Sequence, residues 1–200
     1  MRRAPEPPAP PSGQPTNSQP SNQTPAPVDA ESEKPPRAFP GVLPAEEVEN
    51  KIAVIKTPKG EIRFELLAAE APKTTSNFVY LAKQGYFNGL NFHRVESWVI
   101  QGGDPNCGST GSPPSAAGPC GTGGPGYRFE DEPVRLEYKT GIVAMANAGS
   151  NTNGSQFFIL KQDTSLPPNY TIFGRVTAGQ DVVVKIAAGD TMEKVEILSK

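Results

Sequence analysis

The sequence predicts a mainly β fold, in which a closed antiparallel β-barrel is capped by two α-helices and follows a disordered proline-rich tail. Three observations support this fold class. Many short segments are apolar or alternate between apolar and polar residues, two stretches have helical periodicity, and the N-terminus is rich in proline and poor in charge. No strand–helix–strand alternation is present that would predict a parallel sheet.

The N-terminal region differs in composition from the rest of the chain. The first 44 residues contain 13 of the 23 prolines, and no charged residue occurs between Glu6 and Asp29. Such a segment buries too little apolar surface to offset the entropy lost on ordering it, and its prolines favour polyproline II conformations. We therefore predict a disordered tail and linker over residues 1–46 and one folded domain over residues 47–200.

Strands and helices are expected in a definite order along the folded part. A helix is predicted over residues 71–84, because Pro72 suits a first helical turn and Gly85 suits the C-terminal cap, and a second over residues 180–187. Residues 102–126 are rich in Gly, Pro, Ser and Thr and predict a long irregular loop. Strands are expected at residues 51–57, 61–66, 91–95, 98–101, 141–146, 156–160, 171–176 and 194–198.

Charge and hydropathy exclude several functional classes. The net charge of −2 and the pI of about 5.5 argue against nucleic-acid binding, which normally requires a basic face. No apolar run approaches the roughly 18 to 20 residues of a membrane helix. No signal peptide is expected, because Arg2 and Arg3 are followed by prolines rather than by an apolar segment.

Metal ligands and nucleophiles are scarce. His93 is the single histidine, and Cys107 and Cys120 are too far apart in sequence for a CxxC knuckle, so no metal site and no cofactor are predicted. A nucleophilic Cys–His pair would lack an orienting group, and His93 is expected to be a structural imidazole beside a strand. Residues 121–124 lack the Lys-Ser/Thr of a phosphate-binding loop and predict a turn, and residues 129–132 predict a solvated acidic loop.

Seven motifs follow one another in an order and composition similar to those of the cyclophilin family. They are Phe92-His93-Arg94-Val95, Gln101-Gly102-Gly103-Asp104, Gly121-Thr122-Gly123-Gly124, Phe129-Glu130-Asp131-Glu132, Met145-Ala146-Asn147-Ala148-Gly149, residues 151–159 (NTNGSQFFI) and Ile172-Phe173-Gly174-Arg175-Val176. Each motif is weak alone, but together they span essentially residues 51–200. The resemblance implies an eight-stranded antiparallel barrel closed by two helices, and peptidyl-prolyl cis–trans isomerase activity that assists protein folding.

The implied reaction accounts for the lack of nucleophiles and metal ligands. Rotation about an X–Pro bond is opposed by amide resonance with a barrier of ~18–20 kcal/mol. No bond is broken, so no nucleophile, metal or cofactor is needed. Catalysis requires a hydrogen-bond donor that favours a pyramidal prolyl nitrogen and a pocket that holds the proline ring.

The resemblance assigns these roles to particular residues. Arg94 is the implied catalytic donor, since a guanidinium stays charged and presents fixed N–H groups, and Gln101 is implied to steady it. A surface salt bridge is the alternative role for Arg94, and core packing is the alternative for Phe158 and Leu166. Substrate contacts are implied for Trp98, Val99, Gly121, Ala146, Asn147, Ala148, Gln156, Phe158, Leu166 and Tyr170. Of these, the Asn147 backbone and the Gln156 side chain are implied to pair with substrate main chain.

The chain departs from the usual family pattern around this site. The segment from Arg94 to Gln101 is one residue shorter than the common spacing, Trp98 and Val99 stand where Phe and Met are usual, and Tyr170 occupies a frequent His position. These differences are expected to change the shape of the proline pocket.

An insertion lies between Asp104 and Gly121, bounded roughly by the only two cysteines. We predict that Cys107 and Cys120 form a disulfide that closes this loop, whereas two reduced, unrelated thiols are the alternative.

Three functional hypotheses follow from the sequence. The favoured one is an active prolyl isomerase, the second is a cyclophilin-like peptide-binding module with little turnover, and the third makes the tail a polyproline ligand for an SH3- or WW-like partner. We expect a monomer that acts on proline-containing polypeptides and binds a cyclosporin-type ligand weakly. The proline-rich tether and the cysteine pair favour an extracytoplasmic or cell-envelope location over the cytoplasm.

Overall fold

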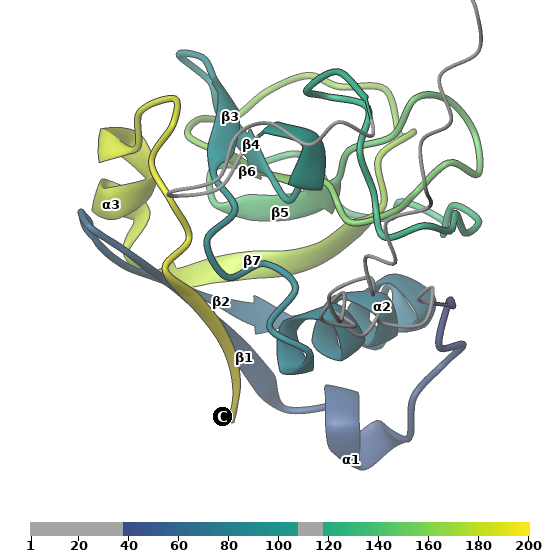
Figure 1. Cartoon of the computed structure of the whole chain (residues 1–200). Coiled ribbons are helices and arrows are strands. Elements are labelled where there is room, and N and C mark those ends of the chain that lie inside the picture. The colour runs from purple at the N-terminus through teal and green to yellow at the C-terminus, as the bar shows by residue number, and fades with distance from the viewer. Residues whose placement is uncertain (1–37, 108–117) are drawn as a thin grey trace, which may run out of the picture. The chain divides into compact units, whose positions relative to one another are not determined.

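The computed structural model of the 200-residue chain describes residues 38–107 and 118–200 (Figure 1). The chain clusters into two units, residues 1–35 and residues 36–200, and the fold described below is that of the second unit. Residues 1–37 of the disordered tail predicted over residues 1–46, and with them the predicted polyproline ligand, lie outside the described residues.

Eight antiparallel strands form one curled sheet, as predicted, with the order β3-β4-β6-β5-β7-β2-β1-β8. The strands are β1 (Lys51–Thr57), β2 (Gly60–Leu66), β3 (Phe92–Val95), β4 (Val99–Gly102), β5 (Ile142–Met145), β6 (Phe157–Leu160), β7 (Ile172–Ala178) and β8 (Lys194–Ser199). Each lies within two residues of its predicted range, because the apolar patterns that predict the strands are also the patterns of burial.

Backbone hydrogen bonds outside the ladders bring the two edges of the sheet together. The Phe92 N–H donates to the Asp190 carbonyl at 2.9 Å, and Asn91 and Thr191 form an isolated antiparallel bridge. The barrel is therefore closed through the segments that precede β3 and β8, rather than by a ladder between these two strands.

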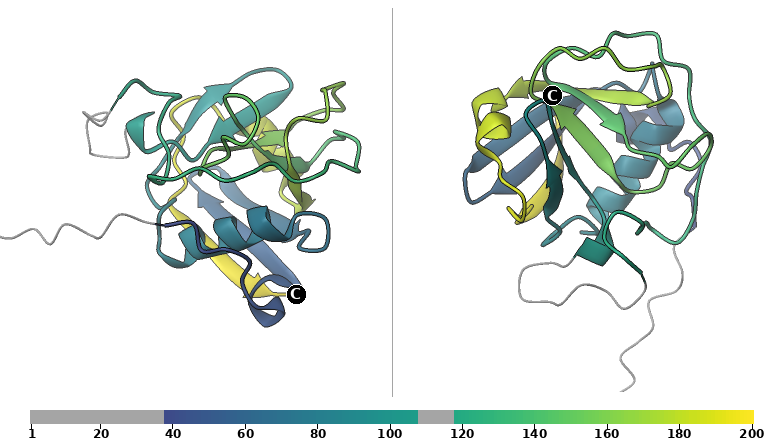
Figure 2. Two further views of the ribbon diagram at one scale, coloured as in Figure 1. Left: turned by 90° about the vertical axis from the view of Figure 1, so that its right-hand side faces the viewer. Right: turned by 90° about the horizontal axis from the view of Figure 1, so that it is seen from above.

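Helix α2 (Pro72–Lys83) covers the inner face of the curled sheet (Figures 1 and 2). Its Phe78 is 1% exposed, and the ring centroid lies 5.5 Å from that of Phe64, 5.6 Å from Phe157 and 5.3 Å from Phe173. Burial of such rings supplies much of the driving force for folding. The second predicted helix is α3 (Gln180–Lys185), and two short helices, α1 (Ala45–Val48) and the 3-10 turn η1 (Pro105–Cys107), were not predicted.

Alternate residues of β5 and β6 lie on opposite faces of the sheet and join different apolar clusters. The main core contains Val143, Met145, Phe157 and Ile159. The second apolar cluster contains Val99, Tyr138, Ile142, Ala144, Phe158, Leu160 and Ile172. Both faces of these two strands are thus buried, which accounts for their continuous apolar sequence.

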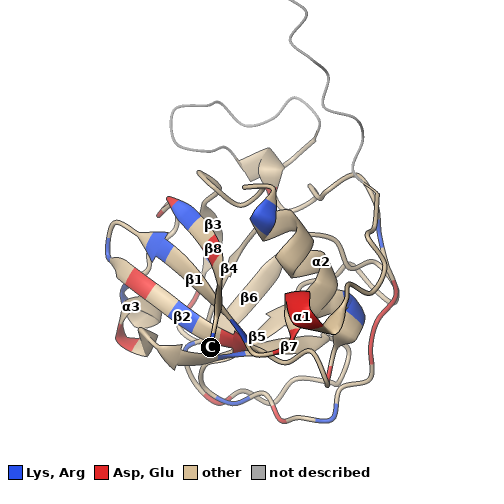
Figure 3. Cartoon of the chain, turned by 90° about the horizontal axis from the view of Figure 1, so that it is seen from below, with Lys and Arg blue, Asp and Glu red and all other residues tan. Residues whose placement is uncertain are grey.

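Charged residues of both signs are interspersed along β1, β2 and β8 (Figure 3). Lys56 lies 2.9 Å from Glu196, and Arg63 lies 2.6 Å from Glu61. Exposed ion pairs of this kind contribute only about 0–1 kcal/mol each, so the stability of the sheet depends mainly on its buried face.

Within residues 38–107 and 118–200, no helix has the length and apolar character needed to cross a bilayer.

The packed part of the chain begins before residue 47, where the domain boundary was predicted. The half-buried Phe39 ring stacks on Phe129 with 4.9 Å between centroids, and the Leu43 N–H donates to the Ser76 hydroxyl at 2.9 Å. Including residues 39–46 in a disordered tail was therefore wrong. The proline-rich composition gave no indication that Phe39 and Leu43 pack against a core whose residues lie far along the sequence.

The acidic segment at residues 129–132 is not a solvated loop throughout, contrary to the sequence interpretation. Glu132 is 8% exposed and accepts hydrogen bonds from the N–H groups of Lys73 and Thr74, both at 2.8 Å. These donors lie in the first turn of α2, where Ala71 provides no side-chain cap. The carboxylate thus satisfies helix donors that would otherwise be unpaired, and it does so from 58 residues away.

We predict that Phe39→Ala lowers the free energy of unfolding by about 1–3 kcal/mol, because the half-buried ring loses its contact with Phe129. Denaturant unfolding followed by circular dichroism measures the change. Val42→Ala is the matched control, since Val42 is 58% exposed, and should cost less than about 0.5 kcal/mol. Equal losses in the two variants would contradict a packing role for Phe39.

Candidate active site

Arg94 on β3 is held in place by side chains from β4 and from the turn between β3 and β4. It is in register with Gln101 on β4, and its Nη1 donates to Gln101 Oε1 at 3.2 Å. Its Nε donates to Glu96 Oε1 at 2.7 Å, and the guanidinium carbon lies 5.5 Å from the centroid of the Trp98 ring. The contact expected between Gln101 and Arg94 is therefore present. Nη2 has no hydrogen bond to any residue that the structure describes, so the exposed Arg94 keeps a donor for a ligand.

Glu96 is a site residue that the sequence analysis missed. One carboxylate oxygen accepts the Arg94 Nε–H bond, and the other accepts from Trp98 Nε1 at 2.8 Å. The hydrogen bond from Arg94 holds the pKa of Glu96 below its ordinary value, which keeps the carboxylate charged. A carboxylate two residues after the arginine could have indicated this role, because residues at i and i+2 of an extended chain share a side.

A chain of polar contacts continues from Gln101 into the loop after β4. Gln101 Nε2 donates to Gln156 Oε1 at 2.9 Å, and Gln156 Nε2 in turn donates to Asp104 Oδ2 at 3.1 Å and to the carbonyls of Gly121 and Gly123 at 3.0 and 2.9 Å. The side-chain amide of Gln156, expected to pair with substrate, already has protein partners for both its oxygen and its nitrogen. Its clearest structural role is to join Gln101 to the loop.

Asp104 fixes the conformation of this loop. It is 0% exposed, and its carboxylate accepts hydrogen bonds from the backbone N–H groups of Asn106, Gly121 and Gly123 at 2.7, 2.6 and 3.1 Å. The expected turn at residues 121–124 is therefore wrapped around a buried carboxylate, which the sequence analysis did not foresee.

A hollow of about 830 Å³ opens beside these polar contacts. Six of the predicted substrate-contact or catalytic residues line it: Gln101, Gly121, Ala146, Asn147, Ala148 and Gln156. Among the described residues, the backbone N–H and C=O of Asn147 have no hydrogen-bond partner, so both groups remain available to a ligand. The Ala148 N–H, in contrast, donates to Thr152 Oγ1 at 2.9 Å.

The apolar candidates gather at the second apolar cluster. Val99 and Phe158 belong to it, and Trp98, Ala146, Leu166 and Tyr170 pack against it. The ring of Phe158 is 5% exposed and meets Tyr170 edge-on, with centroids 5.7 Å apart. Leu166 and Tyr170 are half-buried and can present apolar surface to a ligand. Because Ala146 belongs both to this group and to the lining of the hollow, the apolar and polar parts of the site adjoin.

Cys107 and Cys120 form the predicted disulfide, with their Cα atoms 4.3 Å apart. The alternative of two reduced thiols is not the state in the structure. The bond closes the inserted loop, whose residues 108–117 lie outside the described part. Since Cys120 precedes Gly121, the disulfide restrains the segment that Asp104 and Gln156 bind.

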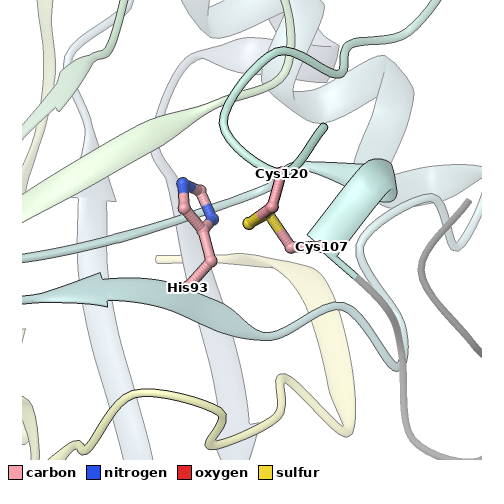
Figure 4. Close-up of side chains that lie close together, drawn as sticks. All are labelled: His93, Cys107 and Cys120. Atoms are coloured by element: carbon pink, nitrogen blue, oxygen red, sulfur yellow. A yellow bond between two sulfur atoms is a disulfide. The ribbon is translucent and has the colours of Figure 1, made fainter. Parts of the chain in front are cut away.

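His93 on β3 lies beside the disulfide (Figure 4). A ring nitrogen and the two sulfur atoms lie within 4.8 Å of one another, and His93 Nδ1 is buried and has no hydrogen-bond partner in the part of the chain that the structure describes. Burial lowers the pKa of His93 below its ordinary value; the charge of Asp104 opposes this shift, and that of Arg94 adds to it. The two cysteines are distant in sequence but adjacent in space, so the sequence argument against a metal site does not hold for the folded chain.

Comparisons with known proteins match this fold and site. A sequence model described as "Cyclophilin type peptidyl-prolyl cis-trans isomerase/CLD" matches residues 52–200. A peptidyl-prolyl cis-trans isomerase of Helicobacter pylori is 44% identical over 149 residues, covering 72% of this chain and 84% of that protein. The peptidyl-prolyl cis-trans isomerase-like 1 of Mus musculus is 44% identical over 144 residues, covering 68% and 80%. The crystal structure of a Cryptosporidium parvum cyclophilin type isomerase superposes with a TM-score of 0.61 at 31% identity, covering 75% of this chain and 98% of that one.

The curled eight-stranded sheet is the architecture of a cyclophilin-like protein, and its Arg94 contacts both Trp98 at the second apolar cluster and Gln101 at the hollow. The match over residues 52–200 makes the assignment specific: the chain belongs to the cyclophilin type peptidyl-prolyl cis-trans isomerases and is an enzyme of that class. None of these comparisons favours the alternative of a binding module with little turnover.

His93 should give the stability a pH dependence of defined sign. Its pKa is lower in the folded chain than the value of about 6.5 expected for the unfolded chain, so the unfolded chain binds the proton more readily. The contribution of His93 to the free energy of unfolding is therefore complete above about pH 6.5 and decreases as the pH falls below that value. Denaturant unfolding at several pH values should show a larger loss between about pH 7 and pH 5 for wild type than for His93→Gln. Parallel losses in the two proteins would show that His93 does not contribute.

Proposed function

We propose that this isomerase acts on accessible X–Pro bonds of polypeptides, with Arg94 as the catalytic donor. The observation that supports this role is that Arg94 is held by hydrogen bonds to Glu96 and Gln101, while its Nη2 has no hydrogen-bond partner among the described residues. The proline ring would lie against Trp98 and Phe158, next to the guanidinium.

A fixed guanidinium suits the chemistry of this rotation. As the amide twists, resonance is lost and the prolyl nitrogen gains a lone pair that can accept a hydrogen bond. A donor already held in position by two side chains needs no reorganisation when this lone pair develops, and such a donor stabilises the transition state more than the planar ground state. Meanwhile the unpaired backbone groups of Asn147 can hold the adjacent main chain as the other side of the bond turns.

A peptide ligand class is supported by a solved relative. A Cryptosporidium parvum cyclophilin type isomerase was crystallised in the presence of the dipeptide Ala-Pro, and its structure matches with a TM-score of 0.57 at 31% identity, covering 74% of this chain and 98% of that one. We extend this ligand class to the present chain as proline-containing polypeptides.

We also propose that the protein is a monomer and that it binds cyclosporin-type ligands weakly. Among the described residues, the exposed large apolar side chains are Val42, Val184 and Leu198, which is little apolar surface beside the roughly 800 Å² that each partner buries in a standard interface. Trp98 and Tyr170, which differ from the usual family residues, support the weak binding. Trp98 donates a hydrogen bond to Glu96, and the Tyr170 ring packs edge-on against Phe158.

The role of Arg94 is tested by Arg94→Ala in a prolyl-isomerisation assay on short X–Pro peptides. Loss of a charge-assisted hydrogen bond in the transition state is worth ~2–4 kcal/mol, so kcat/KM should fall about 30- to 1000-fold while circular dichroism is unchanged. The matched control is Arg175→Ala, which removes another exposed arginine, paired with Glu65 at 3.9 Å, and should leave kcat/KM within about threefold. If Arg94→Ala keeps kcat/KM within about threefold of wild type with unchanged circular dichroism, Arg94 is not the catalytic donor.

We further propose an extracytoplasmic or cell-envelope location, supported by the Cys107–Cys120 disulfide, since such bonds persist in oxidising compartments. In intact cells that produce the protein naturally, an alkylating reagent added before lysis should leave both cysteines unmodified, as measured by mass spectrometry. Alkylation of both residues before any reduction step would contradict this location.

A further inference from the structure

The cluster of His93, Cys107 and Cys120 has no part in the isomerase chemistry described above (Figure 4). We propose that reduction of the disulfide turns this cluster into a binding site for a thiophilic divalent cation, with Zn²⁺ as the best match. The three side chains would be its protein ligands and a water molecule the fourth. This inference does not depend on the proposed isomerase mechanism.

The geometry of the cluster fits a tetrahedral zinc ion. Zn–S bonds of about 2.3 Å place two thiolate sulfurs about 3.7 Å apart, and a Zn–N bond of about 2.0–2.1 Å places the histidine nitrogen about 3.5 Å from each sulfur. The ligand atoms of the cluster already lie within 4.8 Å of one another. With Cα atoms 4.3 Å apart, rotation of the Cys107 and Cys120 side chains about their Cα–Cβ bonds can increase the sulfur–sulfur distance toward this separation once the S–S bond is broken.

Contacts other than the disulfide hold the two cysteines in place. The Cys107 carbonyl accepts a hydrogen bond from Asn91 Nδ2 at 3.2 Å, and the residue after Cys120 donates its N–H to Asp104 at 2.6 Å. Both backbones therefore stay near β3 when the S–S bond is broken. A preformed arrangement of this kind reduces the ordering that metal binding must otherwise supply.

His93 also carries a buried polar atom without a protein partner among the described residues. Its Nδ1 is buried and has no hydrogen-bond partner among the described residues, although buried polar atoms are almost always paired. Imidazole nitrogen and thiolate sulfur together are a donor set that Zn²⁺ prefers. Coordination of the metal ion by Nδ1 would give this nitrogen a partner. If Nε2 coordinates the metal ion instead, a water molecule bound at Nδ1 would do the same.

The redox step needs a dithiol as reductant. Its thiolate attacks Sγ of the exposed Cys120, Cys107 leaves as a thiolate, and the second thiol of the reductant then releases Cys120 and closes the reductant's own disulfide. The protein disulfide thus gains two electrons and two protons. Zn²⁺ binding releases the two thiol protons, and the two thiolates balance the charge of the ion.

The expected consequence is that a cation replaces the disulfide as the clamp on the inserted loop. Cys120 precedes Gly121, whose N–H and C=O are bound by Asp104 and Gln156 at the edge of the hollow. A metal that joins Cys107, Cys120 and His93 would hold this edge against β3 under reducing conditions, as the disulfide does under oxidising ones.

The test uses the full chain, reduced with a dithiol and freed of reductant without oxygen, with Co²⁺ as a spectroscopic probe for Zn²⁺. Reduced wild type should bind one Co²⁺ per chain with a thiolate-to-cobalt charge-transfer band and the visible absorption of a tetrahedral ion, and Zn²⁺ should displace it. The oxidised protein should show neither feature. Circular dichroism must show that the reduced chain stays folded; an unfolded reduced chain would overturn the proposal.

Three variants separate ligation from adsorption. Cys107→Ser should abolish the charge-transfer intensity expected for two thiolates, and His93→Ala should weaken Co²⁺ binding about tenfold or more and alter the visible bands. Asp163→Asn removes an exposed carboxylate bound to Thr140 and should leave binding unchanged. Absence of the charge-transfer band in reduced wild type, or His93→Ala with wild-type affinity and spectrum, would overturn the site.

Discussion

The buried carboxylate of Asp104 is the group on which the arrangement of the site depends. A carboxylate removed from water is tolerated only where hydrogen bonds replace its hydration, and Asp104 receives them from three backbone N–H groups and from Gln156. These donors come from segments that are far apart in sequence. Satisfying one side chain therefore brings together the end of β4, the inserted loop and the residue that precedes β6.

The composition of the loop follows from this requirement. Gly121 has a φ of 95°, and a Cβ on Gly123 would overlap the carboxylate of Asp104, so both positions favour glycine. The glycine-rich run, which in composition is similar to a phosphate-binding loop, is thus explained by the close approach of its backbone to an internal anion. The physical principle is shared, since successive backbone N–H groups surround negative charge, but here the anion belongs to the protein.

Those parts of the fold that depend on local pattern were predictable from the sequence, and those that depend on distant partners were not. The eight strands follow from alternation and continuous apolar runs, and Arg94, Gln101 and Asn147 follow from the resemblance to a family. The capping of α2 by Glu132, the packing of Phe39 on Phe129 and the approach of His93 to the cysteines each join residues far apart in sequence. Charge, proline content and spacing indicated other roles for these residues, because none of these properties reports which segment lies opposite.

The site combines a rigid part with a part that is held by removable contacts. Arg94 and Gln101 lie on paired strands, so the position of the donor is set by the β3–β4 ladder. Gly121 lies on a loop whose conformation depends on Asp104 and on the cysteine pair. From Gln101, the amide-to-amide hydrogen bond to Gln156 links the donor to the loop part. A change in the loop should therefore alter which peptides fit the hollow more than it alters the donor, and binding and turnover can respond separately to the state of the cysteines.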